Sequence, residues 1–354
     1  MKKVLITGIT GQDGSLMADY LLNNFQDIEV YGAHRRLSVP NHENVKHLFS
    51  NSRFKKIELN VSDQFSVANA ISNIKPDFYI NFAANSFVGG SWNTPAEHMQ
   101  TNAMSVIYAL EAIKKHAPNC KFYNAGSSEQ FGDVDYTPQD IKHPFKPRSP
   151  YGVSKCAAHH IVKVWRESYG LFAVQGILFN HEGVRRGEEF VTRKITKNVA
   201  RIVDNIRNNK NFNPLELGNI YSKRDWSDAE DFVKGVWLML NQEKPKDYVL
   251  ASGETHTVKE FIEIAFNHAG IKGQWIDEEI NEKFVFRSYK NEIKYYQDDM
   301  ILVTINEKFY RPAEVDLLWG DPTEAQKDLG WKLETSFEKL VHKMVDNDLK
   351  LLHT

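Results

Sequence analysis

The first half of the chain alternates short apolar runs with segments in which apolar residues recur every three or four positions. The short runs are rich in β-branched and aromatic residues and end in turn residues, which is typical of buried strands. We expect strands at residues 4–6, 29–33, 54–58, 78–82, 121–125 and 174–179. We expect helices at residues 16–22, 64–74, 95–115 and 150–169. Strands that alternate with helices predict an α/β fold, in which helices cover both faces of a parallel sheet.

The pattern loosens after about residue 180, where polar, Asn-rich segments such as residues 205–213 appear. Helical spacing returns at residues 258–269 and 337–349, and we expect residues 225–240 to return to the sheet. The predicted sheet domain comprises residues 1–180 with 225–250, and the predicted smaller, mostly C-terminal portion comprises 181–224 and 251–354. We find no internal repeat, Pro-rich linker or low-complexity tail.

Composition narrows the class of protein. Hydrophobic residues make up 42% and charged residues 25% of the 354 residues, as in an ordinary globular protein. Two cysteines, Cys120 and Cys156, argue against a disulfide framework and fit the reducing cytoplasm. A net charge of −2 gives no reason to expect nucleic acid or a membrane as partner, and no apolar run approaches the length of a membrane span. The MKKVLITG start breaks at Gly8 and is too short for a secretion signal.

A glycine-rich turn follows the first predicted strand and opens the first predicted helix. Gly8, Gly11 and Gly14 have the spacing Gly-x-x-Gly-x-x-Gly. Glycines there permit a tight turn and let the backbone approach a pyrophosphate, which binds at the helix N-terminus. This context favours a dinucleotide site in a Rossmann-type, doubly wound parallel sheet over a turn without a ligand.

The second predicted strand is followed by Arg35 and Arg36, with no acidic residue at its end. A site for NAD usually has a carboxylate there, which accepts a hydrogen bond from the ribose 2′-hydroxyl. A carboxylate would repel a 2′-phosphate, whereas a guanidinium group binds it with two hydrogen bonds. We therefore expect NADP rather than NAD, the alternative being two solvated surface arginines.

A tyrosine and a lysine stand four residues apart in the predicted helix at residues 150–169. Ser149 can cap this helix, and Pro150 suits its first turn. Tyr151 and Lys155 then lie on one helical face, where the ammonium group is expected to lower the tyrosine pKa. Such a pair can exchange a proton with a sugar hydroxyl near neutral pH. Without the glycine motif, the pair would be interpreted as surface packing.

Ser127, Ser128 and Glu129 directly follow the predicted strand at residues 121–125. Ligands of such sheets bind at the carboxyl ends of the strands, where two hydroxyls and a carboxylate can polarise a ketone and move a proton. The alternative interpretation is a helix-capping box that begins at Ser127 or Ser128.

The chain resembles the GDP-mannose 4,6-dehydratase family of extended short-chain dehydrogenases over nearly its whole length. The resemblance rests on six blocks in the same order. These are TGITGQDGS (7–15), RSPYGVSK (148–155), GILFNHE (176–182), RRGEEFVTRKIT (185–196), LGN with KRDW (217–219 and 223–226), and YRPAEVDLLWGD (310–321).

The resemblance implies the catalytic roles. Ser127, Tyr151 and Lys155 would form the dehydrogenase triad, with serine where the family more often has threonine. Glu129 would be the base at carbon 5 of the sugar, and Ser128 would assist at carbon 6. The implied reaction is a redox-neutral dehydration of a GDP-hexose, with GDP-mannose as first choice. The alternatives are a GDP-heptose substrate, a net GDP-sugar reductase or epimerase, and a non-catalytic NADP-binding protein.

Binding roles are also implied by the resemblance, and no metal is expected. The implied NADP contacts are Gly8, Thr10, Gly11, Gln12, Asp13, Gly14, Arg35, Asn60, Val61, Ala83, Ala84, Ser86, Tyr151, Lys155, His181 and Arg186. The implied substrate contacts are Ser86, Asn180, Val191, Lys194, Gly218, Arg224, Arg311 and Glu314. Asn180 and the two arginines would bind the diphosphate, Val191 and Lys194 the guanine, and Glu314 the ribose. Each arginine taken singly would be interpreted as an ordinary surface residue, and the FVTRK segment (190–194) as the start of an amphipathic helix.

The sequence departs from the family pattern at several positions. Asn60 and Tyr221 replace aspartates, and Asn85 replaces a glutamine. Gly126 replaces a serine, and residues 183–184 are Gly-Val where the family has Ser-Pro. Because several of these positions are near the expected sugar pocket, they leave the exact sugar open.

The polar loop at residues 35–44 is longer than a simple turn requires. Loops of that size in a compact domain are usually functional. The resemblance implies that it crosses to a neighbouring subunit beside the cofactor. We therefore expect a homotetramer that is a dimer of dimers.

Overall fold

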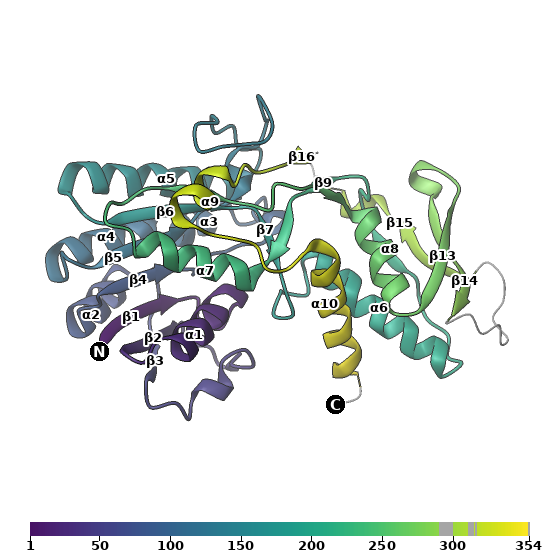
Figure 1. Ribbon diagram of the computed structural model, residues 1–354, viewed down its shortest axis with the longest axis horizontal. Coiled ribbons are helices and arrows are strands. Elements are labelled where there is room, and N and C mark those ends of the chain that lie inside the picture. Colours follow the sequence, from purple (N-terminus) through teal and green to yellow (C-terminus); the bar gives the residue numbers. More distant parts are fainter. Residues whose placement is uncertain (290–299, 311–314, 316, 353–354) are drawn as a thin grey trace.

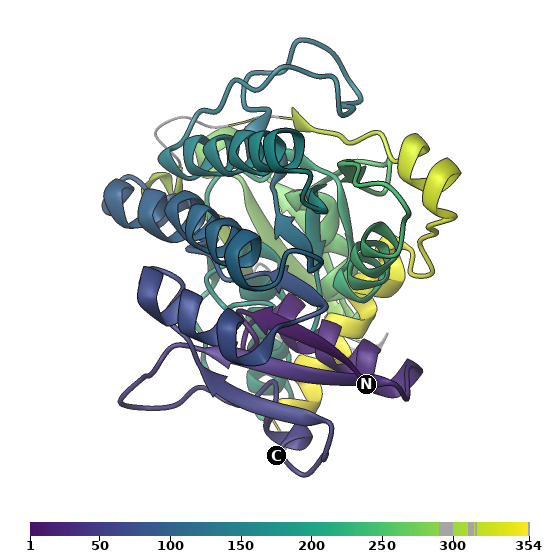
Figure 2. The same cartoon turned by 90° about the vertical axis from the view of Figure 1, so that its left-hand side faces the viewer.

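The computed structural model describes residues 1–289, 300–310, 315 and 317–352. Its centre is a seven-stranded sheet in the order β11-β6-β5-β4-β1-β2-β3, in which all neighbours are parallel (Figures 1 and 2). The strands are β1 (Lys2–Thr7), β2 (Ile28–His34), β3 (Phe54–Glu58), β4 (Phe78–Asn81), β5 (Lys121–Ala125), β6 (Ala173–Leu178) and β11 (Tyr248–Leu250). The first six confirm the predicted strands and, with the helices, the predicted Rossmann-type sheet.

Helices cover both faces of this sheet. On one face lie α1 (Gln12–Asn24), α7 (Ala229–Leu240) and α9 (Thr323–Leu329). On the other lie α2 (Gln64–Ile74), α4 (Ser105–His116) and α5 (Pro150–Tyr169). Val4 and Ile6 of β1 pack against the first set, whereas Leu5 packs against the second. Successive strand residues point to opposite faces, so a strand covered on both sides is largely apolar.

The predicted single helix at residues 95–115 is wrong in its continuity. The chain instead forms α3 (Pro95–Met99), a π-helical turn (Gln100–Met104) and then α4. The π turn contains Asn102, whose buried amide bonds the N–H of Asn85 (2.9 Å), the carbonyl of Asn85 (3.1 Å) and Oγ of Ser154 (3.0 Å). These polar contacts explain why the helix departs from regular geometry here.

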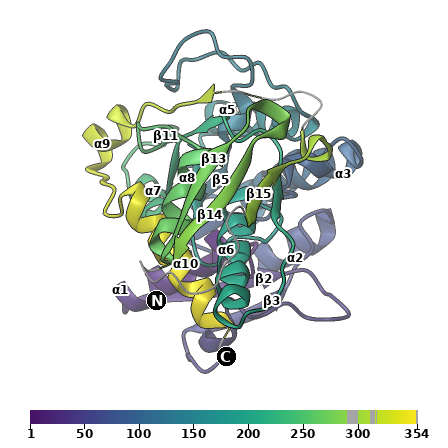
Figure 3. The same cartoon turned by 90° about the vertical axis from the view of Figure 1, so that its right-hand side faces the viewer.

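A second hydrophobic core lies beside the core of the seven-stranded sheet and its helices. It is built on a sheet in the order β13-β14-β15-β8 (Figure 3). Its elements are α6 (Val191–Arg207), β8 (Leu215–Leu217), α8 (Val258–His268), β13 (Ile271–Ile276), β14 (Lys283–Tyr289), β15 (Ile301–Ile305) and α10 (Phe337–Leu351). Helices α8 and α10 confirm the two predicted there. Helix α6 begins in the FVTRK segment (190–194), where the sequence indicated an amphipathic helix start as an alternative, and extends into the polar segment that begins at residue 205.

Two small sheets join the halves of the molecule. One pairs β7 (Asn180–Glu182) with β10 (Trp226–Asp228), and the other has the order β12-β9-β16. The strands of the latter are β9 (Lys223–Arg224), β12 (His256–Thr257) and β16 (Leu317–Leu318). In the part of the chain that the structure describes, no helix is long and apolar enough to cross a membrane.

Candidate active site

A cavity of about 1140 Å³ opens at the carboxyl ends of the sheet strands, between the two hydrophobic cores. Every site residue predicted from the sequence that the structure describes lines this cavity. Arg311 and Glu314 lie outside the described residues. The fold therefore brings together residues that are as far apart in the sequence as Gly8 and Arg224.

The glycine turn leaves no room for side chains. Gly8 has a φ of 70°, and a Cβ on Gly14 would lie 2.4 Å from the carbonyl oxygen of Gly8. Helix α1 follows directly, and its N-cap residue, Gly11, provides no side-chain cap. The first N–H groups of the helix are therefore available to an anion, as a dinucleotide pyrophosphate requires.

The other predicted cofactor residues also follow the ends of strands. Arg35 follows β2 and is exposed, Asn60 and Val61 follow β3, and Ala83 and Ala84 follow β4. At residues 35–44, the loop expected to reach a neighbouring subunit is tied to its own chain, since Asn44 donates a hydrogen bond to the carbonyl of Thr10 (2.9 Å).

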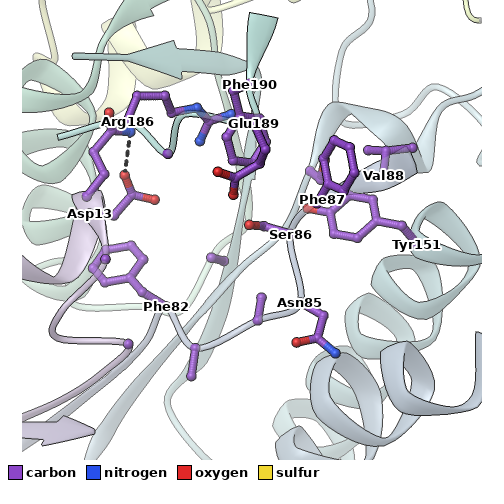
Figure 4. A pocket seen from close by; sticks show the side chains of 18 of the residues that line it. Asp13, Phe82, Asn85, Ser86, Phe87, Val88, Tyr151, Arg186, Glu189 and Phe190 are labelled. Carbon is purple, nitrogen blue, oxygen red and sulfur yellow. Dashed lines mark hydrogen bonds between the residues drawn. The ribbon is translucent and has the colours of Figure 1, made fainter. Parts of the chain in front are cut away.

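Asp13 and His181 form a half-buried pair on one wall of the cavity (Figure 4 shows Asp13). Nε2 of His181 lies 2.9 Å from Oδ2 of Asp13, and Nδ1 lies 2.8 Å from the carbonyl of Phe179. Both ring nitrogens thus face acceptors. Burial works against charge in both groups, but their mutual attraction and hydrogen bond raise the pKa of His181 and lower the pKa of Asp13. Each group therefore favours the charged form of the other, imidazolium beside carboxylate.

Arg186 is held from two sides. Its Nε lies 3.0 Å from the buried carboxylate of Glu182, and its guanidinium lies 3.6 Å from the ring centroid of Phe190. Phe190 also meets Phe87, with 6.2 Å between ring centroids. Figure 4 shows Arg186 and Phe190 on one wall and Phe87 on the other, so the two walls touch at this point.

The predicted catalytic residues converge from two elements. Ser127, Ser128 and Glu129 follow β5, while Tyr151 and Lys155 lie in the first turns of α5. Ser149 caps α5, its Oγ accepting a hydrogen bond from the N–H of Gly152 (3.0 Å). Ser127 faces the Tyr151 hydroxyl and acts to lower its pKa. Nζ of Lys155 donates to the carbonyl of Ala125 (2.7 Å) and lies 5.7 Å from the Tyr151 ring centroid.

The expected lowering of the tyrosine pKa is wrong, because the pKa of Tyr151 is raised. Burial raises the pKa of Tyr151 to about 12, although the hydrogen bond from Ser127 acts in the opposite direction. The negative charge of Glu129 raises it further. Burial also lowers the pKa of Lys155 to about 8, so the ammonium is itself weakly held in its charged form.

The structure confirms the capping interpretation of the Ser127 segment, whereas the catalytic interpretation stays a prediction. Ser127 caps the 3-10 turn Ser128–Gln130 in a capping box, in which Gln130 accepts a hydrogen bond from the N–H of Ser127. The same turn directs Ser128 and Glu129 to the cavity lining. The cap fixes the backbone that carries the two predicted catalytic side chains.

The predicted substrate residues line the end of the cavity nearest the second core. Lys194 in α6 donates to the carbonyl of Glu216 (2.7 Å), and its Nζ lies 3.6 Å from the Phe309 ring centroid. Arg224 in β9 is buried. Oδ1 of Asn180 is buried and has no hydrogen-bond partner within the described chain, which suits a residue that contacts a ligand.

Two departures from the family pattern have a structural reason. A Cβ on Gly126 would lie 2.7 Å from both Nε2 of Gln175 and the carbonyl oxygen of Gly176, so no larger residue fits. Tyr221 donates to the buried carboxylate of Glu282 (2.6 Å), which also accepts from Lys259 (2.6 Å).

Sequence reasoning missed several residues of the site. Phe87, Arg185, Glu189 and Phe190 line the cavity but were not predicted to. Their position beside Ser86 and Arg186 was the available indication. Buried amides within apolar strands were also overlooked, although a polar residue in such a pattern is unusual and can be found from the sequence.

Comparisons with known proteins agree with this geometry. The model of the family described as GDP-mannose 4,6 dehydratase matches residues 5–344. The GDP-mannose 4,6 dehydratase of Drosophila melanogaster is 41% identical over 359 residues, covering 99% of this chain and 87% of that protein. The human protein of the same name is 41% identical over 362 residues, covering 99% and 92%.

Among solved structures, a dTDP-glucose 4,6-dehydratase from Bacillus anthracis in complex with NAD has the same fold. Its TM-score is 0.78 at 18% sequence identity, and the match covers 99% of this chain and 97% of that one. With the family model and the relatives, these matches show that the chain is an enzyme of the GDP-mannose 4,6-dehydratase family.

Proposed function

We propose that this enzyme dehydrates GDP-mannose to GDP-4-keto-6-deoxymannose with NADP as a tightly held, regenerated cofactor. The observation that carries the proposal is the position of Glu129, a carboxylate beside the hydride-transfer residues Ser127 and Tyr151 in one cavity. A reductase or epimerase of this fold has no need of a base there, whereas a dehydratase does. The names of the relatives support the same substrate.

The residues at the first end of the cavity fit a dinucleotide. The glycine turn leaves the space that a side chain would fill, and the N-terminus of α1 offers uncapped N–H groups. Oε1 of Gln12 is buried without a hydrogen-bond partner in the described part of the chain. Arg35 supports NADP, because its guanidinium can pair with the 2′-phosphate that NAD lacks.

The second end of the cavity fits the nucleoside diphosphate. Arg224 and Asn180 would bind the diphosphate, with Lys194 and Val191 at the guanine. We therefore keep the proposed division of the chain, in which residues 1–180 with 225–250 bind the cofactor. Residues 181–224 and 251–354 then form the sugar-nucleotide portion, with Arg311 and Glu314 retained as predictions.

The reaction begins at carbon 4 of the sugar. Tyr151 takes the proton of the carbon-4 hydroxyl while Ser127 hydrogen-bonds the same oxygen. A bound NADP⁺ would supply the hydride acceptor for carbon 4 and the hydride donor for carbon 6, and its positive ring would favour the phenolate of Tyr151. Lys155 holds the Ala125 carbonyl and so anchors the end of β5 beside Tyr151.

The new ketone makes the proton at carbon 5 acidic, and Glu129 removes it. The carbon-6 hydroxyl then leaves as water, with its proton supplied by Ser128 or by the protonated Glu129. Carbon 5 regains a proton as carbon 6 is reduced, which balances the proton that Tyr151 took. The sum is loss of one water with no net oxidation.

The test is redox balance. Purified enzyme given GDP-mannose should form a product lighter by one water without stoichiometric use of NADPH. Product mass and absorbance of NADPH measure the two quantities. Steady consumption of one NADPH per turnover would exclude a dehydratase and favour a reductase.

Glu129→Gln separates the two halves of the reaction. The change keeps the size of the side chain and removes the base, so turnover should fall by about 10²–10⁴-fold. Oxidation at carbon 4 should persist, so that enzyme-bound NADPH accumulates in a single turnover. Full dehydratase activity in this variant would remove Glu129 from the mechanism.

A further inference from the structure

A continuous line of buried side chains crosses four strands of the sheet beneath the cavity. It begins with Oγ1 of Thr7 in β1, which donates to Oδ1 of Asn81 in β4 (2.6 Å). Nδ2 of Asn81 donates to Oδ1 of Asn124 in β5 (2.9 Å). Nδ2 of Asn124 donates to Oε1 of Gln175 in β6 (2.8 Å). Nε2 of Gln175 donates to Oε1 of Gln130 (3.0 Å). We call these five residues the amide ladder.

Every hydrogen bond in the amide ladder runs in the same direction, from β1 towards β6. Asn81, Asn124 and Gln175 each accept through the oxygen and donate through the nitrogen, so these groups polarise one another and the chain is stronger than separate pairs. The chain ends at Gln130, whose Nε2 has no hydrogen-bond partner within the described residues. All five side chains are buried, with exposed fractions of 0–4%. Such groups are costly to bury unless they are paired, so the amide ladder has a defined arrangement.

The two ends of the amide ladder hold the two loops that form the active site. At the first end, Oγ1 of Thr7 accepts a hydrogen bond from the N–H of Ala83 (3.3 Å), which follows β4 beside the glycine turn. At the other end, Oε1 of Gln130 accepts from the N–H of Ser127 (3.0 Å). Ser127 begins the turn that carries Ser128 and Glu129.

We propose that the amide ladder positions the Ser127–Glu129 turn relative to the cofactor loop at Ala83, and that Gln175 is a positioning residue for catalysis. The inference rests on the proposed dehydration. Gln175 does not line the cavity, so it acts only through Gln130. Gly126 leaves the space that this contact occupies, because a Cβ there would meet both Gln175 and Gln130.

Gln175→Met tests the proposal by interrupting the amide ladder with a side chain of similar volume. Because the GDP contacts lie elsewhere, the KM for GDP-mannose should stay within about twofold. The kcat should fall by about 10–100-fold, since displacement of a catalytic group by about 1 Å costs this much. Gln175→Glu should restore most of the kcat, because a buried carboxyl group stays protonated and can both accept from Asn124 and donate to Gln130.

Gln139→Met is the matched control. Like Gln175, Gln139 is fully buried and does not line the cavity. Its Oε1 accepts a hydrogen bond from the N–H of Trp319, which is not part of the amide ladder. The control should lose stability while its kcat stays at the wild-type value. An equal fall of kcat in Gln139→Met, or an unchanged kcat in folded Gln175→Met, would overturn the proposal.

Amide hydrogen exchange gives a readout that needs no turnover. In Gln175→Met, residues 126–131 should exchange about tenfold faster than in the wild type and in Gln139→Met, because the turn opens more easily. The faster exchange is expected even if the wild type does not dehydrate GDP-mannose. The measurement therefore tests the amide ladder independently of the proposed function. Unchanged exchange would overturn the proposal. If Gln175→Met does not fold, Thr7→Val removes the hydrogen bonds at the other end of the amide ladder. Residues 82–87 should then exchange faster than in the wild type, and unchanged exchange there would overturn the proposal.

Discussion

Arg35 is the single side chain on which the choice between NADP and NAD is proposed to depend. It follows β2, is exposed and lines the cavity. Arg35→Ala should weaken binding of NADP by about 1.5–3 kcal/mol, the strength of a charged hydrogen-bonded contact. Binding of NAD should change little. Titration of the apoenzyme with each cofactor measures both affinities, and an equal loss for both would mean that Arg35 has a structural role.

His181 provides a stability contribution that depends on pH. Its pKa in the folded protein is raised above the ordinary value of 6.5 by Asp13, despite burial. A raised pKa adds stability that is complete below the unfolded-state pKa and is lost as pH rises through the folded-state pKa. His181→Gln should therefore lower the free energy of unfolding most below about pH 6.5. The difference should shrink as the pH increases.

Urea unfolding of the wild type and of His181→Gln, between about pH 5 and about pH 9, tests this expectation. Asp13 does not interfere there, because its pKa is lowered below 3.8 and its own contribution is lost only in stronger acid. A difference between the two proteins that grows with rising pH would contradict the imidazolium assignment.

At the scale of elements, the positions of the site residues depend more on the junctions between strands and turns than on the strands and helices themselves. The chain must leave β5 and enter the 3-10 turn Ser128–Gln130 within the space that β6 allows. Gly126 makes this possible, since its N–H donates to the carbonyl of Gly176 (2.8 Å) at close approach. The serine that the family pattern places here would not fit beside Gln175 and Gly176.

Gly126→Ala should therefore destabilise the protein by about 1–3 kcal/mol through overpacking. Gly90→Ala is the control, because its added Cβ would meet only the Phe87 side chain at 3.3 Å, at a φ that is not positive. Thermal unfolding followed by circular dichroism compares the two variants with the wild type. A Gly126→Ala protein as stable as the wild type would show that β6 can shift to admit the side chain.

At the scale of the whole molecule, two hydrophobic cores meet at one cavity, and the loop at residues 35–44 borders it. We predict a homotetramer, a dimer of dimers in which this loop also contacts a neighbour. Because binding and assembly are then linked, NADP should stabilise the tetramer. Light scattering of the wild type and of a loop-shortened variant, each with and without NADP, measures this. A wild-type dimer that neither NADP nor shortening affects would contradict the prediction.

Much of the fold was predictable because it is encoded locally. Six strands of the sheet follow from β-branched runs bounded by turn residues, and α5 follows from Ser149, Pro150 and apolar spacing. Continuity of the helix at residues 95–115 was not predictable, because the π turn depends on contacts of Asn102 with Asn85 and Ser154. For α6 the sequence indicated only an amphipathic start at residues 190–194, because polar residues dominate the composition beyond it.

The sequence by itself determined the sheet, the glycine turn and the family, because backbone conformation and burial pattern depend on neighbouring residues. It also named Tyr151, Lys155 and Glu129 as candidates. Only the tertiary structure decided that Tyr151 has a raised pKa, since burial and the charge of Glu129 depend on distant segments. The amide ladder likewise exists only after four strands align, because its hydrogen bonds join residues that lie 43–74 positions apart along the chain.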